Sequence, residues 1–129
     1  MEAIAKQFVD YYYNTFDTIP ADEGQLNARK ASLQSLYRDG SMLSWEGSQI
    51  LGGAAIVEKI ASLPFQKVLH KVTTIDPQPT SETNLVVLVT GQLVVDDSTN
   101  PIHFSQIFHL ISDAGSYYVQ NDVFRLNYG

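Results

Sequence analysis

Trp45 and Glu46 form the residue pair with the most distinctive chemistry in this sequence. An indole ring offers a broad apolar wall, and a carboxylate beside it accepts hydrogen bonds from a cation. At the rim of a curved sheet, such a pair suits a socket that takes an apolar side chain next to a basic one. The plainer interpretation is a core tryptophan beside a solvated glutamate, and composition alone favours it.

Two further acids, Asp96 and Asp97, stand in a cluster of turn-forming residues that ends at Pro101. Adjacent acids in a hairpin loop usually reflect turn preference and solvation. The pair Asn121-Asp122 lies in a later strand-like stretch. An acid beside a cavity could act as a general base, or it could hold backbone or an arginine within the structure.

The histidines His70, His103 and His109 do not predict a metal site. A metal needs three or four convergent ligands. Residues six apart on a strand are roughly 20 Å apart, so His103 and His109 cannot share one ion. We therefore expect structural histidines and no metal or other cofactor.

Bulk composition narrows the class of partner. The chain has 129 residues, a net charge of −6 and no cysteine. This length favours one domain. Excess negative charge argues against nucleic acid and anionic membrane surfaces, whereas a basic protein partner is compatible with it.

Without cysteine there is no disulfide or thiolate chemistry. The first residues resemble no signal peptide, and no apolar run reaches membrane-spanning length. A cytosolic or nuclear protein is expected.

Hydrophobic spacing predicts an α+β fold in which helices precede most of the strands. Helical periodicity covers residues 3–16, 27–38 and 54–62, and Pro64 stops the third helix. Two short strands are predicted within 41–51 around Trp45. Longer strands are predicted over 68–75, 85–95, 102–111 and 117–126, with 76–79 ending the first of them. Their regular spacing indicates an antiparallel meander.

Strand 85–95 is apolar on both sides, which is unusual for an antiparallel sheet with one wet face. Leu85, Val87 and Val89 share one side, while Val86 and Leu88 share the other. Helices can cover one side, and a sheet-to-sheet homodimer is the economical cover for the other. The alternative is that helices and loops of the same chain cover both.

Several long segments of the chain are distinctive. The stretch from Ala55 to Ile60, followed by Ser62-Leu63-Pro64-Phe65-Gln66-Lys67, is the most specific. The others are residues 8–17, 36–38, 41–47, 91–93, 104–108 and 121–128. In this order, and over nearly the whole chain, these segments resemble the nuclear transport factor 2 family in its fungal form.

The resemblance implies one cone-shaped domain over residues 1–129, with three helices packed on a strongly curved antiparallel sheet. It implies a nuclear import carrier that binds the GTPase Ran in its GDP form and the phenylalanine-glycine repeats of nucleoporins. Such a carrier is a homodimer in cytoplasm and nucleus, concentrated at the nuclear pore. It needs no cofactor of its own.

The resemblance also assigns residues. It implies that Ran inserts an aromatic side chain into a cavity lined by Trp45, Leu63 and Phe124. It implies that Glu46 pairs with a basic Ran residue, and that the acidic loop of Asp96 and Asp97 pairs with a Ran lysine. For Asp122 it favours a structural role.

Two departures from the family pattern are visible. The segment from Ile19 to Arg29 has no expected counterpart, and we interpret it as a surface loop or an added turn on the second helix. The family places an aromatic residue of the nucleoporin-repeat site near the start of the first helix, where this chain has Met1. Methionine also makes adaptable apolar contacts.

Two other classes of function stay open at this point. The fold resembles that of ketosteroid isomerase and scytalone dehydratase, so Glu46, Asp122 and Tyr12 are candidates for enzyme chemistry. The chain could also be a heterodimer subunit, like the small partner of the messenger-RNA export receptor. Fold alone confers neither role.

Overall fold

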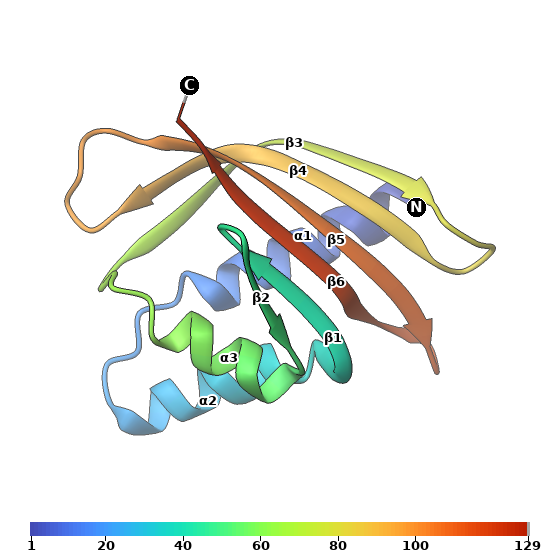
Figure 1. Cartoon of the computed structure of the whole chain (residues 1–129), viewed down its shortest axis with the longest axis horizontal. Helices are drawn as coiled ribbons and strands as arrows, with labels where there is room; N and C mark the ends of the chain where they lie inside the picture. The colour runs from blue at the N-terminus through green and yellow to red at the C-terminus, as the bar shows by residue number, and fades with distance from the viewer. Residues whose placement is uncertain (129) are drawn as a thin grey trace.

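Six strands form one curved sheet in the computed structural model, which describes residues 1–128. The helices are α1 (Glu2–Phe16), α2 (Glu23–Gln34) and α3 (Gly53–Ala61). Figure 1 shows the long strands arching over α1, with α2, α3 and the β1–β2 hairpin below them. The predicted cone-shaped α+β fold of three helices on a strongly curved sheet is confirmed.

The strand order is β2-β1-β6-β5-β4-β3. The strands are β1 (Tyr37–Trp45), β2 (Ser48–Leu51), β3 (Val68–Pro79), β4 (Leu85–Val95), β5 (Ile102–Asp113) and β6 (Ser116–Asn127). β3 to β6 form the predicted antiparallel meander, and β1 joins β6 in parallel. The β1–β2 hairpin therefore lies beside β6, the last strand of the chain.

Three predicted boundaries were wrong, two of the second helix and one of the strand β3. The second helix was expected over 27–38, but it begins earlier because the Asp22 side chain caps it by accepting the Gln25 N–H at 2.8 Å. It also ends earlier, since Tyr37 starts β1. The segment from Ile19 to Arg29 thus supplies the first turns of α2. β3 continues to Pro79, because an edge strand tolerates proline on its unpaired side.

The concave face of the sheet holds the core. Buried side chains of α1, α3, β4, β5 and β6 belong to one core cluster; the buried apolar residues of these elements are Ala5, Phe8, Val9, Tyr12, Tyr13, Phe16, Ile56, Val57, Ile60, Leu85, Val87, Val89, Leu93, Phe104, Phe108, Leu110, Val119 and Phe124. The sequence left open which side of residues 85–95 faces the helices, and the burial of Leu85, Val87 and Val89 shows that it is theirs.

The convex face keeps a row of apolar side chains in the open. Leu88, Ile107 and Val123 are register neighbours on β4, β5 and β6. They are 38%, 39% and 40% exposed, respectively. We call these three residues the outer apolar row. The helices of this chain lie on the other side of the sheet, so nothing in the described residues covers the row.

A buried hydrogen-bond chain crosses the core and centres on Asp122. Tyr37 donates to its Oδ2 at 2.8 Å, and Gln106 Nε2 donates to its Oδ1 at 2.8 Å. Tyr12 shares a 2.7 Å bond with the Tyr37 hydroxyl, while Tyr13 donates to Gln106 Oε1 at 2.7 Å. The carboxylate therefore holds two tyrosines and a glutamine, instead of the backbone or arginine that the sequence suggested.

Burial governs the ionisation of this network. It raises the pKa of Asp122 from 3.8 to about 6, and the bonds from Gln106, Tyr37 and Tyr12 oppose that rise. Burial also raises the pKa of Tyr12 and of Tyr37 well above 10, with the charge of Asp122 adding to it. The two hydroxyls therefore stay protonated and remain donors.

The raised pKa of Asp122 makes folding stability depend on pH. The folded state binds the Asp122 proton more tightly than the unfolded state does, so this term destabilises the fold as pH rises from about 4 to above 6. The cost reaches about 3 kcal/mol once the group is ionised in both states. Urea unfolding of wild type and Asp122→Asn across this range should show wild type losing stability relative to the variant.

The substitution Asp122→Asn also changes the unfolding free energy by an amount that does not depend on pH. The informative quantity is therefore how the difference in unfolding free energy between wild type and variant changes with pH. A difference in unfolding free energy that stays flat from about pH 4 to 7 would contradict the prediction. Circular dichroism of both proteins at each pH is the control for native structure.

Candidate functional site

A stack of three aromatic rings stands where the end of α1 meets the ends of β1 and β6. Trp45 lies parallel to Phe124, with ring centroids 4.2 Å apart and 5° between the planes. Phe16 stacks on Trp45 at 6.4 Å and 12°. Phe124 is fully buried and Trp45 is partly buried. Trp45 is thus the outer ring of the Trp45–Phe124 pair and shields Phe124.

Glu46 occupies the tip of the β1–β2 hairpin in a strained conformation. It and Gly47 form the two-residue turn between Trp45 and Ser48, with φ of 50° and 89°. Positive φ at both positions is the type I′ geometry, which costs a side-chain-bearing residue. Glu46 Oε1 accepts the backbone N–H of Leu126, which leaves Oε2 available beside the aromatic stack.

Asp96 organises the segment that follows α3. Its Oδ1 accepts the backbone N–H groups of Gln66 at 2.9 Å and Lys67 at 3.0 Å. Its own N–H donates to the Lys67 carbonyl at 2.9 Å. Asp97 differs, because its side chain is 97% exposed and lies 3.8 Å from the Lys67 ammonium. One acid shapes a loop, and the other presents its charge to solvent.

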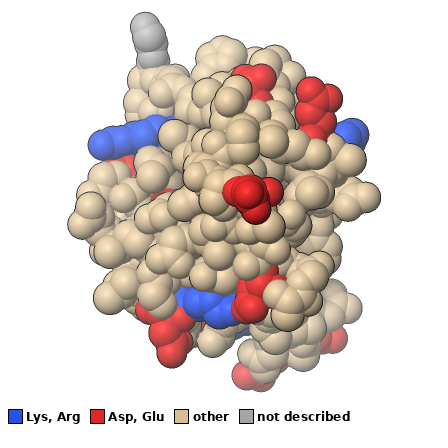
Figure 2. Space-filling view, turned by 90° about the vertical axis from the view of Figure 1, so that its right-hand side faces the viewer, with Lys and Arg blue, Asp and Glu red and all other residues tan. Residues whose placement is uncertain are grey.

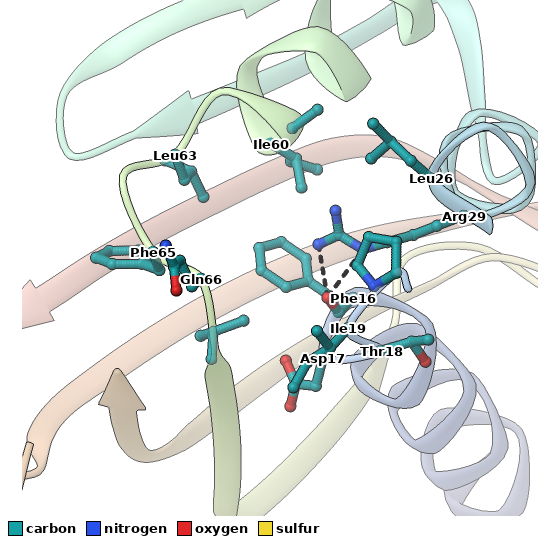
Figure 3. Close-up of a pocket in the computed structure, with 13 residues that line it drawn as sticks. Phe16, Asp17, Thr18, Ile19, Leu26, Arg29, Ile60, Leu63, Phe65 and Gln66 are labelled. Atoms are coloured by element: carbon teal, nitrogen blue, oxygen red, sulfur yellow. Dashed lines mark hydrogen bonds between the residues drawn. The ribbon is translucent and has the colours of Figure 1, made fainter. Parts of the chain in front are cut away.

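A cavity of about 360 Å³ opens between the end of α1, α2 and the segment after α3. Figure 3 shows Phe16, Leu26, Ile60 and Leu63 converging on it. The full lining is Phe16, Asp17, Thr18, Ile19, Pro20, Leu26, Arg29, Ile60, Ala61, Leu63, Phe65, Gln66 and Val68. Most of the lining side chains are apolar, and Asp17, Thr18, Arg29 and Gln66 add polar groups that could fix the orientation of a guest.

The structure brings some of the predicted residues to this cavity and leaves others beside it. Leu63 lines it directly, whereas Trp45, Glu46 and Phe124 do not. Trp45 adjoins the cavity, because it stacks on Phe16, which lines it. The acidic loop also adjoins the cavity, because Asp96 accepts a hydrogen bond from Gln66, another lining residue.

Met1 lies in a different place. A cavity of about 330 Å³ is formed there by Met1, Ile4, Pro79, Leu85, Tyr117 and residues of the β3–β4 turn. Figure 1 places the N-terminus beside that turn, and Figure 2 shows that this end of the molecule carries only scattered charges. The two candidate sites are therefore separate.

His70 belongs to the core. Its ring stacks on Tyr13 with centroids 4.2 Å apart. Its Nδ1 lies 2.7 Å from Asp17 Oδ1, and its backbone N–H donates to Asp17 Oδ2 at 2.7 Å. These contacts fit the structural role expected for it. Within residues 1–128, no cluster of three or more potential ligand side chains could hold a metal ion.

Arg29 is a cavity residue that sequence reasoning did not identify. Burial lowers the pKa of its guanidinium from the ordinary value, and the charge of Asp17 opposes that shift. Leu26, Arg29 and Leu33 are spaced three and four residues apart, so they share one face of α2. That spacing was the available signal, but the predicted helix began at residue 27 and did not include Leu26.

The candidates for enzyme chemistry do not meet at a cavity. Asp122 and Tyr12 are both fully enclosed and bonded within the buried network. Neither residue, nor Glu46, lines either of these cavities or a third, more open one of about 500 Å³ between α1 and α2. A substrate in those cavities would have no contact with these groups.

No helix in the described part of the chain has the length and apolar character needed to cross a bilayer.

Comparison with known proteins gives the family. A model of the nuclear transport factor 2 (NTF2) domain matches residues 4–126. The curated nuclear transport factor 2 of Candida glabrata is 54% identical over 127 residues, covering 98% of this chain and 94% of that protein. The solved nuclear transport factor 2 of Cryptosporidium parvum superposes with a TM-score of 0.84 at 42% identity, covering 98% of this chain and 94% of its own.

The fold also occurs in proteins of other function. A protein assigned as a scytalone dehydratase from Novosphingobium aromaticivorans superposes with a TM-score of 0.75 at 13% identity, covering 98% of this chain and 83% of its own. Identity that low shows a shared fold and nothing about activity. The family model and the close relatives agree over nearly the whole chain, and the chain therefore belongs to the nuclear transport factor 2 family.

Proposed function

We propose that this protein is a nuclear import carrier that binds Ran in its GDP form and the phenylalanine-glycine repeats of nucleoporins. It moves between cytoplasm and nucleus and concentrates at the pore. Its close relatives are named as transport factors, which supports a carrier over an enzyme. The observation that carries the proposal is Glu46, held in a strained turn beside the aromatic stack with one carboxylate oxygen free.

Ran docks where the aromatic stack, the cavity and the acidic loop adjoin. Leu63 provides apolar wall inside the cavity, and Trp45, backed by Phe124, provides it at the rim. Glu46 accepts a hydrogen bond from a basic Ran side chain. Asp96 holds the loop in place, while exposed Asp97 contributes long-range attraction for a lysine.

The two subunits of a homodimer cover each other's convex faces. Apolar side chains on three adjacent strands form a row that residues 1–128 leave uncovered. When two copies associate, each buries the outer apolar row of the other. This burial stabilises the dimer by roughly 25 cal/mol per Å² of apolar area removed from water. A homodimer also distinguishes this protein from a heterodimer subunit.

Nucleoporin repeats bind at the Met1 cavity, at the other end of the molecule from the Ran site. Met1 is 51% exposed and lies with Ile4 and Tyr117. A thioether side chain adapts its shape to an aromatic guest. Because the proposed contacts are the apolar ones of Met1, Ile4 and Tyr117, the binding is weak and insensitive to salt. Ran and a repeat can then be held at the same time.

The first prediction concerns Glu46. Glu46→Lys should weaken binding of Ran-GDP at least roughly a hundredfold, because breaking a partly desolvated ion pair costs about 2–5 kcal/mol and charge reversal adds repulsion. Glu46→Gln keeps an acceptor for the Leu126 N–H, so it isolates the charge and should cost about tenfold. Calorimetry with Ran-GDP measures both, and Ran-GTP should bind none of the proteins.

Glu82→Lys is the matched control, since it makes the same charge change in the β3–β4 turn at the opposite end of the sheet. It should bind Ran-GDP as wild type does. Melting curves show whether Glu46→Lys is folded, because it loses the bond to Leu126. Normal melting together with wild-type affinity would remove Glu46 from the site.

A second prediction tests the homodimer. Analytical ultracentrifugation at low micromolar concentration should give about twice the 14.3 kDa chain mass. Ile107→Asp places a charge at the centre of the outer apolar row and should give a folded monomer. Leu51→Asp changes another exposed apolar residue, on β2, and should remain a dimer. A wild-type monomer would rule out this interface.

The third prediction concerns the repeat site. In an NMR titration, a phenylalanine-glycine peptide should shift signals of Met1, Ile4 and Tyr117 and leave the Trp45 indole signal in place. Affinity should change less than about threefold between low and high salt, because screening acts on charges and not on apolar contacts. A peptide with serine in place of phenylalanine is the control. Shifts confined to Trp45 would mean that the two sites are one.

A further inference from the structure

Arg29 reaches the cavity from the segment that departs from the family pattern. It is half-buried on α2 and lines the cavity together with Ile19 and Leu26 of the same segment. Its Nε and Nη2 donate to the Phe16 carbonyl at 3.1 and 2.6 Å, which fixes the guanidinium plane. Its Cζ lies 5.5 Å from the centroid of the Phe16 ring.

Part of the guanidinium is left for a guest. A guanidinium has five N–H donors, and the Phe16 carbonyl accepts from two of its nitrogens. The third, Nη1, has no acceptor among the side chains and backbone of residues 1–128. In Figure 3 it points away from Phe16, toward the space between Leu26 and Ile60. No buried polar side-chain atom is unpaired in this part of the chain, so the unpaired Nη1 is exposed to solvent. Arg29 lines this cavity and also the more open one between α1 and α2.

Asp17, the acid in the cavity wall, does not neutralise this cation directly. Both of its carboxylate oxygens are bonded to His70, one to the backbone N–H and the other to Nδ1. No ion pair joins it to Arg29 among the described residues. The cavity therefore combines apolar walls with one orientated cation, a combination that suits a carboxylate attached to an apolar body.

On the wall opposite Arg29, the nearest charged group of the acidic loop is the carboxylate of Asp96. Gln66 lines the cavity and donates its N–H to Asp96, so the acidic loop adjoins the wall that faces away from α2. A segment that crosses the cavity thus meets a cation at one end and an acid at the other. Charges placed this way fix the direction in which the segment lies.

We propose that Arg29 binds a carboxylate on the partner segment that occupies this cavity, so that the partner presents an acidic side chain beside its apolar one. The occupant is a protein segment, because the acidic loop at the far wall provides a second charged contact that a small carboxylate could not reach. The proposal rests on the proposed function for the identity of the partner, Ran-GDP. It gives the segment from Ile19 to Arg29 a role in partner selection.

The first arm of the test is calorimetry with Ran-GDP. Arg29→Gln should weaken binding about tenfold, and Arg29→Lys, which keeps the cation, should recover part of the loss. Lys30→Gln is the matched control, since Lys30 is the next residue on α2 and pairs at the surface with Glu58. It should change affinity less than about twofold. Melting curves report any loss of the contact with Phe16.

The second arm does not need Ran. In NMR titrations, 3-phenylpropionate should bind wild type and Lys30→Gln at least about threefold more tightly than its neutral amide, 3-phenylpropanamide. The preference should disappear in Arg29→Gln and persist in Arg29→Lys. Signals of Ile19, Leu26 and Leu63 should move together, because these residues share the cavity.

The outcomes separate the two proposals. Equal binding of both probes, or binding of neither, overturns the carboxylate site. A carboxylate preference together with unchanged Ran affinity in Arg29→Gln overturns the assignment to the partner segment and favours a small carboxylate as the guest. If wild type does not bind Ran-GDP, the proposed function fails, and the probes alone decide whether Arg29 forms a carboxylate site.

Discussion

The buried carboxylate of Asp122 ties the architecture together. Through Tyr12 and Tyr37 it connects β6 to α1 and β1, and through Gln106 it connects to β5 and, by way of Tyr13, back to α1. Each polar side chain in this hydrogen-bond network has a partner. This is the condition under which a buried network stabilises one arrangement of the core. The first helix is thereby held in one position under the arch of the sheet.

Fixing α1 there determines what the rest of the surface can do. The core fills the concave face, so the same Asp122 and Tyr12 that could have served an enzyme are sealed from the cavities described. The surfaces that stay open are the two ends of the sheet and its convex face, where the proposed partner sites lie. At one end α1 finishes beside Trp45, and at the other it begins beside the β3–β4 turn.

The end near Trp45 shows how backbone strain and charge are combined. Glu46 accepts a left-handed backbone conformation, and its bond to Leu126 helps to hold it there. Asp96 also has positive φ and holds the neighbouring segment through Gln66 and Lys67. Both acids thus make structural bonds in addition to the partner contacts proposed for them. Arg29 repeats this pattern on the opposite wall, since it supports the end of α1 through Phe16 and keeps one nitrogen for the cavity.

The sequence by itself determined the element types, the apolar character of both sides of β4, and the family, because these depend on local periodicity and on contiguous residue identity. It misplaced α2, since a single capping bond from Asp22 decides where that helix begins, and it ended β3 early, because only the sheet order reveals that proline lies on an edge strand. It also could not show that Asp122 faces tyrosines 85 and 110 positions away. Tertiary structure alone decided that network and the meeting of Arg29 with Leu63 in one cavity, since both depend on packing between segments that are distant in the chain.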